Sequence, residues 1–163
     1  MKQYLKFTGK YTLAHVLTYL IVGGIAYPLS TKEFYVGDNP VFSTFMVTQN
    51  EPELWSNVIK WIIPAQILRG VLLASVLYPF FETINAWNYF KRFLTLSSLY
   101  LVIGFWASTV AAPGTIDGMV YMRPEITMNI HLQVQWEIVT QGILLSAWIA
   151  KWMKPKAITH AID

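Results

Sequence analysis

Two ionisable residues stand in otherwise apolar segments of this sequence and are its first candidates for chemistry. Arg69 lies near the middle of the apolar run 58–81, and Glu137 lies near the middle of the run 127–150. If these runs cross a bilayer, a lone charge at its centre costs at least ~2.5–3.5 kcal/mol on insertion scales. Pairing removes most of that cost, and a guanidinium can hold a carboxylate through two hydrogen bonds. The sequence therefore predicts an Arg69–Glu137 ion pair inside a helical bundle.

Amide side chains accompany both charges. Gln133, Glu137 and Gln141 recur every four residues, so they share one face of a helix. Gln66 precedes Arg69 by three residues and shares its face. Lipid offers amides no hydrogen-bond partners, so these groups either satisfy one another or face water or a polar ligand. The candidates for a ligand-binding site or an ion path are Arg69, Glu137, Gln66, Gln133, Gln141 and Asn129.

Two interpretations of the charged pair remain open. The pair can lock two helices together and fix their register, or it can line a ligand site or an ion path. A lock needs one pair, whereas several polar groups converge here, which tilts the interpretation toward a site. Pro64 lies just over one turn before Arg69 and either opens room at the site through a kink or is simply tolerated.

The histidines are secondary candidates. His15 and His131 are expected near opposite ends of their helices, roughly 20 Å apart in depth at ~1.5 Å per residue. One haem held by both is therefore not expected, while a haem with one His and one Met ligand, or a haem shared with another chain, stays open. The chain has no cysteine, no HExxH motif and no phosphate-binding glycine pattern. We predict no metal site, and the sequence assigns no cofactor.

The composition indicates the environment of these residues. Of 163 residues, 55% are hydrophobic, 15% aromatic and only 13% charged, and a soluble domain carries about 25% charged residues. This balance excludes a disordered chain, and the lack of cysteine excludes a disulfide scaffold. The net charge of +3 does not indicate nucleic-acid binding, because the basic residues form no stripe and instead flank apolar runs.

Four runs approach the ~20 residues that a membrane-spanning helix needs. The sequence predicts an all-α integral membrane bundle, a single transmembrane domain over 1–163, with spans at about 11–28, 58–81, 93–112 and 127–150. The fourth run is the most polar. A cleaved signal peptide over the first run and a soluble helical bundle are the disfavoured alternatives.

The basic residues predict the orientation. Eight of them fall on one side of the expected spans, and that side is the cytoplasmic one; they are Lys2, Lys6, Lys10, Lys91, Arg92, Lys151, Lys154 and Lys156. Both termini are then cytoplasmic, and loops 29–57 and 113–126 lie outside. The apolar stretch Val41–Val47 of the longer loop either lies on the interface or covers the outer mouth of the bundle.

Small residues suggest close contacts. Gly104, Ser108 and Ala112 have small-xxx-small spacing, which predicts a packing face for another helix or subunit. The pair Gly23 and Gly24 is interpreted in the same way, with close backbone approach at a site as the alternative.

These features favour a small polytopic membrane protein of the cytoplasmic membrane of a prokaryote. Its buried Arg69–Glu137 centre is expected to bind a small polar or anionic ligand or to handle ions, within an oligomer. One alternative is a structural or assembly subunit of a larger membrane complex. Another is a membrane enzyme acting on a lipid-type substrate, which is less favoured because no second carboxylate lies at mid-depth. The expected partners are the lipid bilayer and a homo-oligomer or other membrane subunits, and not nucleic acid.

Overall fold

The computed structural model describes residues 1–153, which fold as an all-α molecule, as the sequence predicts. A π-helical turn extends the first helix over Tyr27–Thr31, and a longer π-helical segment, Leu99–Trp106, extends α4. Two of the basic residues that predict a cytoplasmic side, Lys154 and Lys156, lie outside the described residues. The helices are α1 (Lys2–Ala26), α2 (Pro52–Leu77), α3 (Phe81–Ala86), α4 (Tyr89–Ser98), α5 (Ile116–Tyr121) and α6 (Met128–Trp152).

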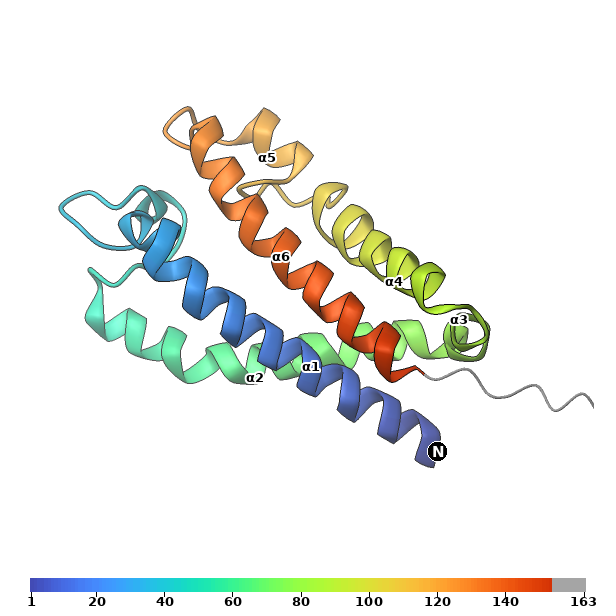
Figure 1. Cartoon of the computed structure of the whole chain (residues 1–163). Coiled ribbons are helices and arrows are strands. Elements are labelled where there is room, and N and C mark those ends of the chain that lie inside the picture. The colour runs from blue at the N-terminus through green and yellow to red at the C-terminus, as the bar shows by residue number, and fades with distance from the viewer. Residues whose placement is uncertain (154–163) are drawn as a thin grey trace, which may run out of the picture.

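The long helices lie in a row in the order α2, α1, α6, α4 (Figure 1). Neighbours in this row run antiparallel, so the N-terminus of α1 and the end of α6 lie at the same end of the molecule. The short helix α3 also lies at this end, which we call the inner end. The opposite end, the outer end, carries α5 and the segment that links α1 to α2.

The predicted spans correspond to these long helices, but several boundaries differ. The first two helices begin well before the expected residues 11 and 58. The third ends at Trp106, so Ser108 lies beyond it and the predicted packing face with Gly104 does not form. Ser108 and Thr115 instead bind nearby backbone groups, and such local bonds compete with helix continuation.

Two helices of the described chain are long and apolar enough to cross a membrane. They are the continuous helical stretches Lys2–Phe34 and Pro52–Ala86. The helix α6 has 25 residues, but its amides and its carboxylate lower its mean hydropathy. The helix α4 has only 10 residues before the π-helical segment that continues it.

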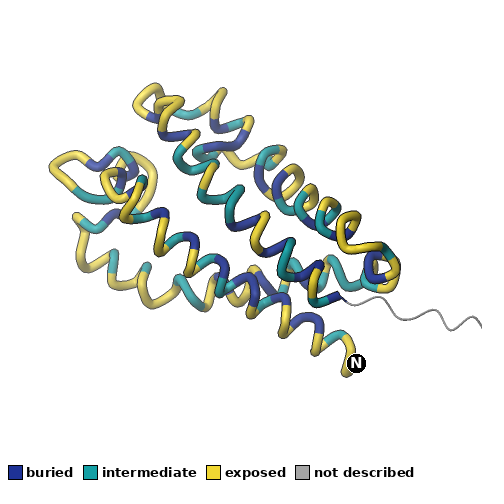
Figure 2. The backbone as a smooth tube through the Cα atoms, viewed as in Figure 1, coloured by how far each residue is buried: buried dark blue, intermediate teal, exposed yellow. Residues whose placement is uncertain are grey.

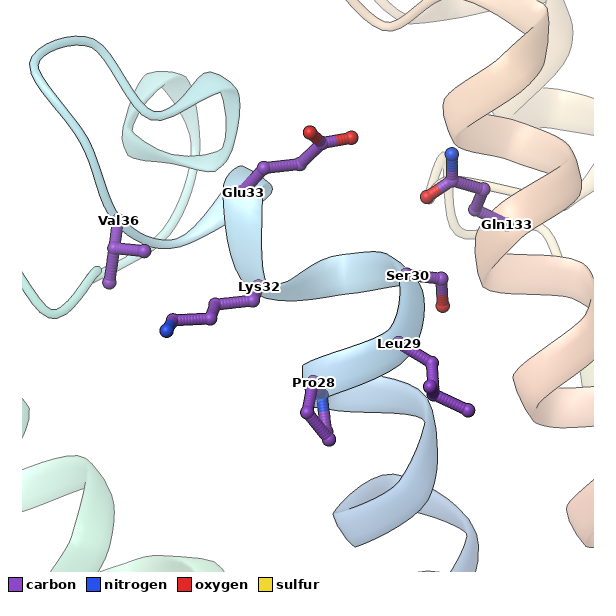
Figure 3. A pocket seen from close by; sticks show the side chains of 7 residues that line it. All are labelled: Pro28, Leu29, Ser30, Lys32, Glu33, Val36 and Gln133. Carbon is purple, nitrogen blue, oxygen red and sulfur yellow. The ribbon is translucent and has the colours of Figure 1, made fainter.

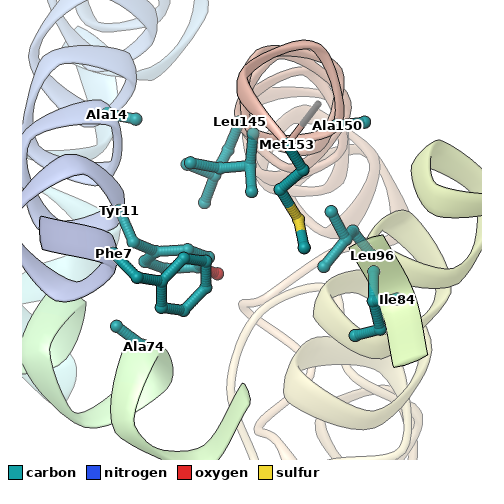
Figure 4. Close-up of a cluster of buried hydrophobic side chains, with 10 residues drawn as sticks. Phe7, Tyr11, Ala14, Ala74, Ile84, Leu96, Leu145, Ala150 and Met153 are labelled. Carbon is teal, nitrogen blue, oxygen red and sulfur yellow. The ribbon is translucent and has the colours of Figure 1, made fainter. Parts of the chain in front are cut away.

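One face of α1 supplies much of the core. Phe7, Tyr11 and Ala14 recur at helical spacing and pack with Leu145 of α6, which is 1% exposed (Figure 4). Figure 2 colours most residues on the outward faces of the helices as exposed, and large apolar residues are among them. On α2 these include Leu68, Leu72 and Val76. Exposed apolar patches of this kind are typical of surfaces that contact lipid, a ligand or another chain.

The long outer loop folds back over the outer end of α6. Phe34 and Phe42 are buried there with Ile126 and Ile130, and the two phenylalanine rings lie 5.2 Å apart. The stretch that begins at Val41 therefore covers the outer end of the helices, which was one of the two predicted placements.

A close backbone contact joins α1 and α2. A Cβ atom added at Gly70 would lie 2.9 Å from the Cα atom of Thr12, closer than real Cβ atoms approach backbone. Glycine at this position lets the two backbones approach each other. The contact sets how far α2 can slide along α1.

We predict that Gly70→Ala lowers the free energy of unfolding by about 1–3 kcal/mol, because the added methyl group forces α2 away from α1. Gly24→Ala is the matched control. It lies in α1 with nothing within 4 Å of an added Cβ, and it should gain about 0.5–1 kcal/mol from helix propensity. Reversible unfolding in detergent measures both. Equal effects of the two substitutions would contradict the close contact.

Candidate polar site along helix α1

In the inner part of the site, a hydrogen bond joins α1 and α2. His15 is fully buried, and its Nε2 atom lies 3.1 Å from Oε1 of Gln66. The Nδ1 atom of His15 is buried and has no hydrogen-bond partner. The glycine contact at Gly70 explains this pairing, because Gly70 and Gln66 lie one turn apart on the same face of α2.

Arg69 lies beside this hydrogen bond. Its charge acts on His15 of α1 and on Tyr100 of the π-helical extension of α4. The side chain of Arg69 is nevertheless exposed. The guanidinium group is therefore near polar groups of two helices and is also accessible from outside the chain.

The outer part of the site surrounds Glu137 of α6. This side chain is half-buried, and a Cβ atom added at Gly23 would lie 3.7 Å from its Oε1 atom. Gly23 thus lies beside the carboxylate at ordinary van der Waals distance, whereas Gly24 has nothing within 4 Å of an added Cβ. The charge of Glu137 also acts on Tyr35 of the outer loop.

Tyr19 links the two parts. His15, Tyr19 and Gly23 follow at intervals of four residues and therefore share one face of α1. The side chain of Tyr19 interacts electrostatically with both Arg69 and Glu137. We call the line from Glu137 through Tyr19 to Arg69 and His15 the polar track.

The structure does not show the predicted Arg69–Glu137 ion pair, because the two residues lie at different depths. Arg69 lies 17 residues after the start of α2 at Pro52, and Glu137 lies nine after the start of α6 at Met128. The difference of eight residues corresponds to about 12 Å along the helices at ~1.5 Å per residue. The expectation of roughly 5 Å assumed that α2 begins at Ser56.

The contacts with α1 also place the two charges at different depths. Gly70, the residue after Arg69, lies against Thr12, and Glu137 lies opposite Gly23, which is eleven residues further along α1. Eleven residues correspond to about 16 Å at ~1.5 Å per residue, so the helix starts and the helix contacts together place the charges about two to three helical turns apart.

The amide stripe of α6 is only partly brought into this track. The Oε1 atom of Gln133 and the Nε2 atom of Gln141 are buried without hydrogen-bond partners, one turn to either side of Glu137. A buried amide group left unpaired costs about 1–3 kcal/mol, which an occupant able to bond with it would recover. Asn129 is exposed and lies two turns before Glu137, so it is not part of the track.

His131 has a separate position and holds the shorter outer loop. The backbone N–H of Gly114 donates to Nδ1 of His131 at 2.8 Å, and the amide of Gln135 donates to the Gly114 carbonyl at 2.9 Å. Gly114 has a φ of +91°, which favours glycine. Both bonds describe a loop anchor. Within residues 1–153, no group of three or more His, Asp or Glu side chains could hold a metal ion.

A pocket of about 550 Å³ opens at the outer end beside the track. Figure 3 shows Ser30 and Glu33, from the end of the first helix, reaching toward Gln133 on α6, while Lys32 points away from it. The hydroxyl of Ser30 also accepts a hydrogen bond from the Trp136 indole at 3.2 Å. Gln133, one turn before Glu137, is the residue of the amide stripe that lines this pocket.

Sequence reasoning missed the aromatic and glycine members of the site. Tyr19 and Gly23 were detectable, since they continue the four-residue spacing from His15. Tyr35 was not, because it reaches Glu137 from a loop about 100 residues earlier in the chain.

Comparison with known proteins gives no relative: no family model, no curated protein and no solved structure matches this chain. The site must therefore be interpreted from its own chemistry.

The outer loop gives a titration test of the geometry. Burial raises the pKa of Tyr35 to about 12, and the nearby Glu137 carboxylate adds to this effect. We predict that Glu137→Gln lowers the pKa of Tyr35, whereas Glu125→Gln, in an exposed part of the other outer loop, leaves it unchanged. NMR titration of ¹³Cζ-labelled tyrosine, assigned with Tyr35→Phe, measures this pKa. An unchanged value in Glu137→Gln would mean that the loop does not lie over the carboxylate.

The raised pKa of Tyr35 also makes the free energy of unfolding depend on pH. Folded Tyr35 keeps its proton above its ordinary pKa of 10.0. Its contribution to the free energy of unfolding is therefore complete below about pH 10 and lost as the pH rises toward about 12.

Proposed function

We propose that this chain is a small integral membrane protein whose polar track binds a small polar ligand with an anionic group, within an oligomer. Its four long helical segments span the bilayer, and both termini are cytoplasmic. The carrying observation is that Arg69 and Glu137 do not pair with each other, yet both interact with Tyr19 between them. A ligand with an anionic group near Arg69 and a hydroxyl or N–H donor near Glu137 would use both charges.

The hydrogen-bonding needs of the track support a polar occupant. Gln133 and Gln141 keep buried polar atoms without partners on either side of Glu137, and His15 keeps one ring nitrogen without a partner. A ligand with several donors and acceptors would satisfy them. The outer pocket beside Gln133 gives such a ligand a polar entrance.

The exposure of Arg69 supports an oligomer. Its neighbours on the outward face of α2, Leu68 and Leu72, are exposed apolar side chains. A charge exposed to lipid at this height would cost at least ~2.5–3.5 kcal/mol. A second copy of the chain, another membrane subunit or the ligand itself would cover the guanidinium group.

Membrane placement is supported by the distribution of apolar and basic residues. Two helices have the length and hydropathy of membrane spans. Lys2, Lys6 and Lys10 begin α1, while Lys91 and Lys151 lie near the ends of α4 and α6 at the same, inner end of the molecule. This asymmetry is typical of a cytoplasmic face.

The topology can be tested on a clean background, because the chain has no cysteine. We predict that a membrane-impermeant maleimide labels Asp38→Cys in intact cells. Asn88→Cys should react only after the membrane is opened. Both positions are exposed, so accessibility within the protein does not limit the reaction. Labelling of both from the same side would contradict the spans.

Ligand binding is tested by native mass spectrometry of the protein after gentle extraction. We expect a small molecule at fixed stoichiometry in the wild type. Arg69→Met and Glu137→Gln should each weaken its binding at least tenfold, because each removes a charge-assisted hydrogen bond worth about 1.5–3 kcal/mol. Lys60→Met, an exposed charge on the same helix as Arg69, is the control.

Two outcomes would contradict the ligand site. Wild-type protein without a small molecule, but with additional protein chains, would make it an assembly subunit. Full retention of the small molecule in both variants would place the ligand elsewhere.

A further inference from the structure

A second pocket, of about 490 Å³, lies at the inner end of the molecule, far from the polar track. The first turns of α1, the helix α3 and the end of α6 enclose it. We call it the inner pocket. Its lining combines two lysines and two amides with a mainly apolar wall; the residues are Gln3, Lys6, Lys10, Asn85, Phe7, Tyr11, Phe81, Ile149, Trp152 and Met153.

The wall of the inner pocket is built to contact hydrocarbon. Phe7 and Phe81 pack edge to face with ring centroids 5.0 Å apart, and Figure 4 shows Phe7 and Tyr11 facing Met153 from the opposite side of the core. Tyr11, Ile149 and Met153 belong to the main hydrophobic cluster. An occupant with an apolar part would extend this core.

The rim of the inner pocket is positively charged. Lys6 and Lys10 lie one turn apart on α1, and the ammonium of Lys10 lies 5.5 Å from the ring centre of Trp152. The nearby carboxylate of Glu82 accepts a hydrogen bond from Gln3 at the exposed edge. Two lysines line the pocket and the Glu82 carboxylate lies only at its edge, so the lining itself is positively charged, which favours an anionic occupant.

An unsatisfied polar group points to a donor on the same occupant. Asn85 is only 8% exposed, lines the pocket, and its Oδ1 atom is buried without a partner. An occupant with only anionic oxygens could not donate to this carbonyl. A headgroup that combines a phosphate with hydroxyl groups could satisfy both Asn85 and the lysines.

We propose that the inner pocket binds an anionic phospholipid with a hydroxylated headgroup. The phosphate pairs with Lys6 and Lys10, a headgroup hydroxyl donates to Asn85, and the beginning of an acyl chain lies along Phe7, Phe81 and Met153. The pocket lies at the first turns of α1, the depth at which headgroups meet a spanning helix. This proposal rests on the proposed membrane placement but not on the ligand of the polar track.

The test is native mass spectrometry of the full chain in detergent with added phosphatidylglycerol or phosphatidylcholine. The wild type is expected to retain phosphatidylglycerol at least tenfold more tightly. The double variant Lys6→Gln/Lys10→Gln should lose this preference, and Lys6→Arg/Lys10→Arg should keep it. Lys2→Gln/Lys91→Gln removes the same charge from the same end without touching the pocket, and is expected to behave as wild type.

A second variant tests the headgroup contact. Asn85→Leu removes the carbonyl at similar size, and is expected to bind phosphatidylglycerol and phosphatidic acid equally, whereas the wild type prefers the hydroxylated lipid. Unchanged melting temperatures check that each variant is folded.

Three results would overturn the proposal. Equal binding of the two lipids by the wild type would exclude a charged headgroup site. Equal losses in the pocket and control double variants would show only general attraction between charges. Displacement of the lipid by millimolar inorganic phosphate would make the inner pocket a free-phosphate site. Loss of labelling asymmetry between Asp38→Cys and Asn88→Cys would instead refute the membrane placement itself.

Discussion

The close contact between Gly70 and Thr12 determines where the polar groups of this molecule meet. Because no side chain separates the two backbones there, α2 has one favourable register along α1. That register places Gln66 against His15, and it places Arg69, the residue before Gly70, near the level of Thr12. On its other side, α1 accepts α6 with Glu137 at Gly23, eleven residues further out than Thr12. One helix therefore fixes the depth of both charges.

This arrangement explains how the chain carries two opposite charges in its apolar helices without pairing them. Tyr19 stands between them and interacts with both. Around Glu137, unpaired amide atoms and a loop tyrosine make a polar lining rather than a closed salt bridge. Under the proposed function, a ligand that bonds to these groups would regain the free energy lost in leaving them unsatisfied.

The sequence predicted the parts of the molecule that depend on local pattern. The apolar runs located the long helices, and the four-residue spacing of Gln133, Glu137 and Gln141 located the polar face of α6. The prediction of an ion pair was wrong because it depended on the residue at which α2 begins. The first turn of α2 is polar: Pro52 occupies a position that favours proline, and the carboxylate of Glu53 lies near the helix N-terminus. Hydrophobic periodicity gives no signal for a polar turn, so the sequence placed the start of α2 about one turn too late. The predicted depth of Arg69 was wrong by the same amount.

Contacts between distant segments could not be predicted from pattern at all. The approach of Tyr35 to Glu137 follows from packing of the aromatic outer loop on Ile130. The role of His131 follows from a loop glycine with positive φ that needs an acceptor for its N–H. The inner pocket likewise depends on three segments that meet only in the folded chain.

The central claim is that Arg69 and Glu137 are held apart for an occupant instead of neutralising each other. A double-mutant cycle with Arg69→Met and Glu137→Gln, on the free energy of unfolding of ligand-free protein in detergent, tests it most directly. Separate charges about two to three turns apart predict a coupling energy below about 0.5 kcal/mol. A coupling of about 3 kcal/mol would instead demonstrate a buried ion pair and contradict the account.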